Sequence, residues 1–187
     1  MKLFKNLRLN LGQTALRNRS GSVKRAVNKF DFTSARQIGI LWDATSDSGL
    51  SVISSFINKM NESGKHTEVL AYIPGKEVSD RLTGLSYMKF LRPNDLNFTF
   101  IPVSDDAREF MKKKFDILID INPSRIFPLT YIATLSNALM RVGVDNNSDK
   151  EDAPYELMIQ TGRTPDIAAF LDQAIHYLSQ INNPVRG

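Results

Sequence analysis

The chain has 187 residues, 42% of them hydrophobic and 24% charged, which is the length and composition of one globular domain with its own core. It contains no cysteine, which excludes disulfides, thiolate metal sites and cysteine nucleophiles, and two histidines are too few for a histidine-rich metal site. No apolar run approaches the roughly 20 residues that span a bilayer. The first ten residues lack the apolar core of a secretory signal, so we expect a cytoplasmic protein.

The net charge of +4 is unevenly distributed along the chain. Residues 1–30 contain eight basic side chains and no acidic one, and removing these eight charges from +4 leaves −4 for residues 31–187. We therefore divide the chain into a basic arm, residues 1–30, and an α/β domain, residues 31–187. The basic residues of the arm are Lys2, Lys5, Arg8, Arg17, Arg19, Lys24, Arg25 and Lys29.

The arm is predicted to be mostly helical. Its apolar residues recur at helical spacing between the basic ones, at Leu3, Phe4, Leu7 and Leu11. Gly12 is expected to interrupt this helix, and a break is expected near Gly21. Ser22 is then placed to cap a second short helix that runs to Phe30.

Beyond the arm, short apolar runs that predict strands alternate with periodic stretches that predict helices. Strands are predicted at 36–42, 67–73, 98–103, 115–121, 141–144 and 155–160. Helices are predicted at 50–64, at 104–114, from Pro128 onward and at 164–181, with a short helix near 78–82. Residues 145–153 are expected to form an exposed loop.

Several of these strands are nearly continuous apolar runs, which favours a parallel sheet covered by helices on both faces. The sequence therefore predicts a three-layer, doubly wound, six-stranded Rossmann-like α/β fold with a basic helical arm at its N-terminus. The expected strand order is 3-2-1-4-5-6. Pro102 places the third predicted strand, 98–103, at one edge of the sheet. This order puts the topological switch point between strands one and four.

Three segments resemble a family of short, uncharacterised bacterial proteins found mainly in Bacteroidota. They are ARQIGILWDAT (35–45), FDILIDINPSRIFPLTYIATLSNALMRVGVD (115–145) and YELMIQ (155–160). This likeness covers nearly the whole chain and implies no known activity. The IDIN and RVGV segments also resemble the N-terminal Rossmann-like half of heptosyltransferase-type glycosyltransferases. That half mostly holds the acceptor, and the second domain that mostly holds the donor sugar nucleotide has no room here after Val144.

The switch point supplies the candidate site, because ligands of open α/β sheets bind beyond the carboxyl ends of the strands there. Two loops are expected to face each other, with the residues Asp43, Thr45, Ser46 and Asp47 after strand one and Asp120, Asn122, Ser124 and Arg125 at and after strand four. Asp43 and Asp120 are suited to hold a cation or to act as a carboxylate pair, and Arg125 to meet an anionic group. The same residue types are also ordinary turn and helix-capping residues.

Motifs that mark a known chemistry are missing where they are expected. The first strand is not followed by G-x-G-x-x-G or by a Walker A sequence, and the chain has no G-x-S-x-G elbow. A dinucleotide site of the usual kind and a serine hydrolase are therefore disfavoured. The sequence assigns no catalytic residue, metal or cofactor, and His176 is interpreted as a packing residue of the last helix.

Three hypotheses of function stay open. The first is a non-enzymatic binding or interaction domain that takes a small anionic ligand or a protein partner in the crevice. The second is an enzyme or subunit of glycosyl or nucleotide chemistry that uses Asp43 and Asp120. The third is an accessory protein whose arm binds nucleic-acid phosphates or an anionic membrane surface. For the arm itself, the favoured interpretation is that it packs Leu3, Phe4 and Leu7 on the domain and leaves its cations in water.

Overall fold

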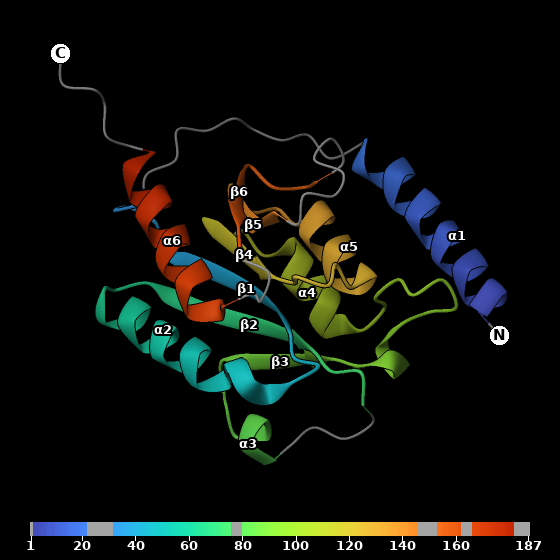
Figure 1. The fold of residues 1–187 in the computed structure, drawn as a ribbon, viewed down its shortest axis with the longest axis horizontal. Coiled ribbons are helices and arrows are strands. Elements are labelled where there is room, and N and C mark those ends of the chain that lie inside the picture. The colour runs from blue at the N-terminus through green and yellow to red at the C-terminus, as the bar shows by residue number, and fades with distance from the viewer. Residues whose placement is uncertain (1, 22–31, 76–79, 146–152, 162–165, 182–187) are drawn as a thin grey trace.

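A computed structural model describes residues 2–21, 32–75, 80–145, 153–161 and 166–181. Within them, six parallel strands form one sheet in the order β3-β2-β1-β4-β5-β6, and helices cover both of its faces (Figure 1). The predicted three-layer, doubly wound Rossmann-like fold and its strand order are therefore confirmed. The strands are β1 (Gln37–Asp43), β2 (His66–Tyr72), β3 (Met88–Leu91), β4 (Ile117–Ile121), β5 (Met140–Asp145) and β6 (Leu157–Gln160).

The helices begin and end where local chemistry favours it. Ser104 accepts a hydrogen bond from the backbone N–H of Ala107, and Asp166 accepts two such bonds at the start of the last helix. Gly64 follows the second helix with a φ of 72°, in the left-handed region that favours glycine. The helices are α1 (Lys2–Ser20), α2 (Leu50–Glu62), α3 (Asp80–Thr83), α4 (Asp105–Lys112), α5 (Phe127–Leu135) and α6 (Ile167–Gln180).

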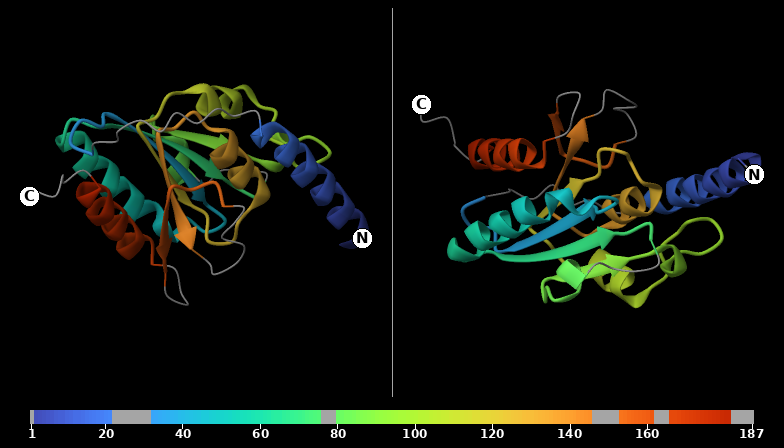
Figure 2. Two further views of the ribbon diagram at one scale, coloured as in Figure 1. Left: turned by 90° about the horizontal axis from the view of Figure 1, so that it is seen from above. Right: turned by 60° about the horizontal axis from the view of Figure 1, so that its bottom comes forward.

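The sheet separates two hydrophobic cores. Ile40 and Trp42 of β1 pack with α2 and α6 on one face, whereas Leu41 packs with α4 and α5 on the other. This alternation follows from the strand geometry, which turns successive side chains to opposite faces. Figure 2 shows the layers, with α1 outside α5 at one end of the molecule.

The third predicted strand, 98–103, is wrong, because the edge strand β3 is Met88–Leu91, which pairs with β2. The segment 98–103 is a tight loop with only an isolated bridge between Leu96 and Pro102. Asn97 forms this loop, because its side-chain oxygen accepts hydrogen bonds from the backbone N–H groups of Thr99 and Ile101. A side chain that takes these donors competes with a strand ladder.

Two predictions about the arm are also wrong. Gly12 does not interrupt α1. A side chain there would place its Cβ 2.3 Å from the carbonyl oxygen of Thr99, so the glycine instead allows α1 to approach the backbone at Thr99 closely. The expected packing of Leu3, Phe4 and Leu7 on the domain is not found, because their side chains stay 85%, 58% and 56% exposed, although Phe4 meets the ring of Phe98. The second predicted helix, 22–30, lies outside the described residues.

Candidate functional site

A cavity of about 650 Å³ lies between α1 and the carboxyl ends of β1, β2 and β4. Its walls come from α1, from the loops after these strands and from the start of α5. The described lining residues include three cations, Lys5, Arg17 and Arg125, and no carboxylate. The larger part of the wall is apolar or aromatic and includes Leu9, Leu16, Tyr72, Leu96, Phe100, Ile126 and Phe127.

Arg125 reaches this cavity from a tight turn after β4. Its backbone N–H donates to the carbonyl of Asn122 over 3.1 Å, and its φ is 48°, a left-handed conformation that arginine rarely adopts. The buried side chain of Asn122 holds the turn closed. Its Oδ1 accepts from the N–H of Ile126 at 2.8 Å, and its Nδ2 donates to the carbonyl of the same residue at 3.2 Å. Backbone strain that is fixed in this way is typical of binding and active sites.

The guanidinium of Arg125 is incompletely paired. Its Nε and Nη2 atoms are buried and have no hydrogen-bond partner among the described residues. Buried polar groups in native proteins are nearly always paired, and a charged donor without an acceptor is costly. Arg125 therefore combines two buried donors that lack an acceptor with a place in the wall of a cavity whose described residues include no carboxylate.

Asp120 is buried in β4, and it is close enough to Arg125 for the arginine charge to lower its pKa. The hydroxyl of Tyr155 donates to Oδ2 of Asp120 over 2.5 Å, and Oδ1 has no partner among the described residues. Burial raises the pKa of Asp120 to about 7. The hydrogen bond from Tyr155 and the charge of Arg125 lower this pKa, and the charge of Asp43 raises it. Burial, and then the Asp120 charge, raise the pKa of Tyr155. Asp120 does not itself line the cavity.

Asp43 faces a different and smaller cavity, of about 160 Å³, which Asp166 and Phe170 also line. Its Oδ1 accepts hydrogen bonds from the backbone N–H and the hydroxyl of Thr45, at 3.1 and 2.5 Å. Within the described residues, no group of three or more histidine, aspartate or glutamate side chains is placed to hold a metal ion. The structure thus gives Asp43 the role of a turn-forming carboxylate.

The predicted crevice residues are therefore divided. Thr45 and Arg125 share the large cavity, whereas Asp43 lines the small one and Asp120 and Asn122 are buried. Ser46 and Ser124 line neither cavity. Ser46 bonds to Ser48 within its own loop, Ser124 is exposed, and the side chain of Asp47 lies outside the described part of the chain.

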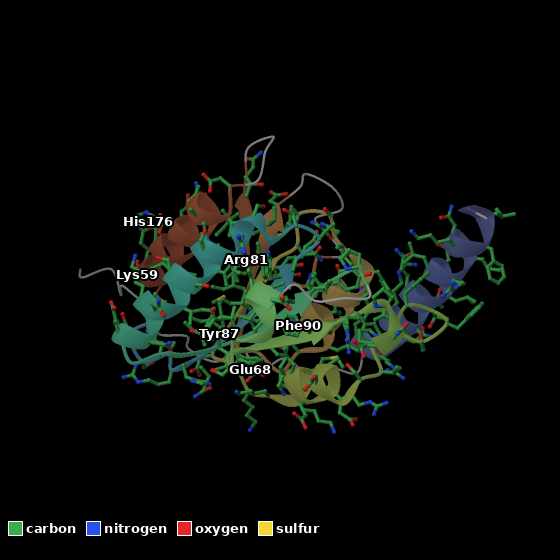
Figure 3. All side chains as sticks on the ribbon, turned by 90° about the horizontal axis from the view of Figure 1, so that it is seen from below. Lys59, Glu68, Arg81, Tyr87, Phe90 and His176 are labelled. Atoms are coloured by element: carbon green, nitrogen blue, oxygen red, sulfur yellow. The ribbon has the colours of Figure 1, made fainter. Side chains whose placement is uncertain are left out.

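His176 is far from this site. It lies on α6, at the opposite side of the molecule from α1 (Figure 3), and its Nε2 is 3.1 Å from the side-chain nitrogen of Gln180. Its side chain is exposed, so the interpretation as a packing residue is wrong. The last helix instead buries Phe170, Leu171, Ala174 and Leu178.

Sequence reasoning missed several residues of the site. Lys5 and Arg17 were assigned to the arm and not to the crevice, because the position of α1 over the loops depends on tertiary contacts. Tyr155 was read only as the start of a strand. One signal for it was present, since Gly143 inside the buried strand β5 indicates a close approach. A Cβ at Gly143 would lie 2.5 Å from the ring of Tyr155.

The fold and the cavity define a Rossmann-like α/β protein with a cavity at its switch point whose described lining is basic and includes no carboxylate. A model of a family of unknown function, DUF6913, matches residues 8–181, and the chain belongs to that family. The predicted resemblance to an uncharacterised family is thereby confirmed. A comparison with curated proteins finds no match, and the likeness to heptosyltransferase-type enzymes stays a prediction. None of the helices in the described residues has the length and apolar character to cross a membrane.

Proposed function

We propose that this protein is a binding domain for a small oxyanion-bearing ligand, which occupies the cavity under α1 and is held by Arg125. One observation carries the proposal: Arg125 lines a cavity whose described residues include no carboxylate, and its buried Nε and Nη2 atoms have no acceptor among the described residues. A ligand that supplies the acceptor removes the cost of the unpaired donors.

The two unused donors indicate the chemistry of the ligand. Nε and Nη2 form one edge of the planar guanidinium, and this edge matches the two oxygens of a carboxylate or phosphate. Lys5 and Arg17 stand on α1 at the same cavity with exposed side chains. They add positive potential where the ligand enters.

The cavity walls indicate the rest of the ligand. A volume of about 650 Å³ lies within the range of small-molecule sites, roughly 300–1,000 Å³. Leu9 and Leu16 of α1 line it together with Phe100 and Phe127. The ligand class that fits is therefore an anion with an apolar or aromatic body, and not a bare inorganic ion.

Thermal unfolding of the full chain tests the proposal. The panel comprises orthophosphate, nucleotides, sugar phosphates, and aliphatic and aromatic carboxylates. A ligand at a hundredfold excess over its Kd stabilises the folded state by roughly 2.7 kcal/mol. The shift should disappear in Arg125→Gln. It should persist in Arg108→Gln, which removes an exposed guanidinium from α4.

Two results would contradict the proposal. One is a panel in which no oxyanion raises the melting temperature. The other is a stabilising ligand that binds Arg125→Gln as well as the parent, which would place it elsewhere. Comparison of the phosphates with the carboxylates in the panel shows which of the two oxyanions the cavity binds.

The catalytic alternative, an enzyme that uses Asp43 and Asp120, stays a prediction. Asp120 has the property that favours it, a pKa of about 7, but it does not line the ligand cavity. Turnover of a bound ligand that is lost in Asp120→Asn, with binding retained, is the result that would support it. A cytoplasmic location is likewise a proposal, and cell fractionation tests it.

A further inference from the structure

The side of α1 that faces away from the domain carries a row of apolar side chains that stay about half exposed or more among the described residues. We call Leu3, Phe4, Leu7, Leu11 and Phe98 the outer stripe. The four residues of α1 recur every three or four positions and so share one side of the helix. Phe98, which is 57% exposed, meets Phe4 edge-on with ring centroids 5.7 Å apart. The stripe thus continues from the helix onto the 96–103 loop.

The contacts on the other side of α1 hold the outer stripe toward solvent. Nε of Arg8 donates to the carbonyl of Phe98 over 2.6 Å, and its guanidinium lies 4.3 Å from the ring centroid of Phe100. Gly12 fits closely against the carbonyl of Thr99, and Arg19 donates to the hydroxyl of Tyr131. Burial of the stripe by a roll of the helix would break these contacts.

The charge around the stripe selects its partner. Residues 1–30 carry eight cations and no acid, and Lys5, Arg17 and Arg19 have exposed side chains on α1. At 100° per residue, Arg8 and Arg17 lie about a quarter turn to either side of the stripe. An apolar stripe with flanking cations suits a surface whose outer layer is negatively charged and whose interior is apolar.

We propose that α1 docks on the surface of an anionic lipid bilayer, with the outer stripe inserted at the boundary between headgroups and acyl chains. The apolar residues enter the interface, and the flanking Arg8 and Arg17 lie at the level of the lipid phosphates. The proposed ligand cavity lies on the opposite side of the same helix, and Arg17 lies between that cavity and the outer stripe. The helix lies on the membrane and does not cross it.

A second copy of this chain is disfavoured as the occupant. Pairing two outer stripes would bring together two helices that both lack acidic residues, and their like charges would repel. A bilayer that contains anionic lipid has the opposite charge. The charge complementarity therefore favours the membrane over self-association.

Sedimentation of the full chain with vesicles tests the proposal. We expect at least tenfold stronger binding to vesicles of phosphatidylcholine with about 30% phosphatidylserine than to phosphatidylcholine alone. Each cation near an anionic surface contributes roughly fivefold in affinity, and salt screens that part. Binding should therefore weaken roughly several-fold between about 0.1 and 0.5 M salt.

The variant Leu7→Ser/Leu11→Ser removes apolar area without a change of charge. Both side chains are about half exposed, so folding should be unaffected, which an unchanged melting temperature confirms. Vesicle binding should fall at least roughly tenfold. The control is Asn6→Ser/Asn10→Ser, which changes exposed residues of the same helix outside the stripe and should bind within about twofold of the parent.

Three results would overturn the proposal. The first is the absence of binding to phosphatidylserine vesicles. The second is equal binding by the stripe variant and its parent, which would show contact through charge alone. The third is a dimer, seen by light scattering, that the stripe variant loses, because the occupant would then be a second copy. Each result leaves the test of Arg125 unaffected, since that test is made without lipid.

Discussion

Tyr155 donates its hydroxyl hydrogen to Oδ2 of Asp120 over 2.5 Å and so ties the segment before β6 to the buried centre of β4. Asp120 is 1% exposed, and Arg125 is close enough for its charge to act on both groups. The three side chains form one electrostatic unit beside the ligand cavity. The protonation of Asp120 therefore depends on what Arg125 meets in that cavity.

The raised pKa of Asp120 predicts that stability falls as pH rises. The native carboxyl titrates at about 7 and the unfolded one at 3.8, so the native state holds the proton more tightly. The contribution of the protonated Asp120 to the free energy of unfolding is complete below the unfolded pKa and is lost as pH rises through the native pKa of about 7. Between pH 5 and pH 8 we expect the free energy of unfolding to drop by roughly 2–3 kcal/mol, measured by urea denaturation.

Asp120→Asn is the control for this titration. Asparagine keeps an oxygen that accepts from Tyr155 but carries no charge at any of these pH values. Its free energy of unfolding should change less between pH 5 and pH 8 than that of the parent. A variant with the same pH dependence as the parent would show that Asp120 is not the titrating group.

Ligand binding should also take up a proton near pH 7. The positive charge of Arg125 lowers the pKa of Asp120, and an oxyanion bound to Arg125 cancels part of that effect. The pKa of Asp120 then rises and the carboxyl takes up protons. Calorimetric titration of a bound oxyanion in two buffers of different ionisation enthalpy measures this uptake. Asp120→Asn should bind without it, and equal uptake in the variant would contradict the coupling.

Gly143→Ala should destabilise the protein by displacing Tyr155. The added Cβ would lie 2.5 Å from three ring atoms, closer than side chains approach each other. Overpacking of this kind costs roughly 1–3 kcal/mol, and loss of the hydrogen bond to Asp120 adds to it. Urea denaturation gives the change. Gly84→Ala is the matched control, because no atom lies within 4 Å of a Cβ at that position.

The order of the sheet was predictable because its central strands are distinctive. The sequence ILIDI of β4 is buried at every residue and reads as a strand covered on both faces. The edge strand was not predictable in this way. Met88–Leu91 has only four residues and is partly exposed, whereas 98–103 has stronger strand formers. The turn that Asn97 makes outweighs their propensity.

The candidate site was predictable only in part. The topology correctly placed the loops after β1 and β4 at the same edge of the sheet. It did not show that Asp120 pairs with Leu41 inside the sheet, one residue before the end of β4, and is covered by Tyr155. Side-chain burial of this kind depends on contacts between segments 35 residues apart, for which the sequence pattern offers no measure.

The buried guanidinium of Arg141 should make Glu156 important for stability. Arg141 is 2% exposed, and Oε2 of Glu156 accepts from its Nε at 3.1 Å and from its backbone N–H at 2.8 Å. Glu156→Ala leaves this charge without its carboxylate, which typically costs roughly 3–5 kcal/mol. Glu156→Gln keeps the acceptor and should lose less. Urea denaturation ranks the two, and an alanine variant as stable as the parent would contradict this role.

Gly12→Ala should release α1 from the domain. Alanine favours a helix interior over glycine by about 1 kcal/mol, so the exchange would ordinarily stabilise α1. Here the new Cβ would lie 2.3 Å from the carbonyl oxygen of Thr99 and 2.9 Å from the ring of Phe127, and the clash outweighs that gain. Trypsin should then cleave after Arg8 and Arg17 roughly tenfold faster, because a released helix unfolds locally more often and cleavage needs an unfolded backbone.

Asn10→Ala is the matched control for this prediction, because it raises the helix propensity of α1 at an exposed position. Its cleavage should be no faster than that of the parent. Release of α1 also removes one wall of the cavity, so Gly12→Ala should weaken any ligand that Arg125 holds. Equal cleavage of Gly12→Ala and the parent would mean that the loop of Thr99 yields to the added methyl group. A loss of ligand binding without faster cleavage would instead mean that the methyl group narrows the cavity while α1 stays in place.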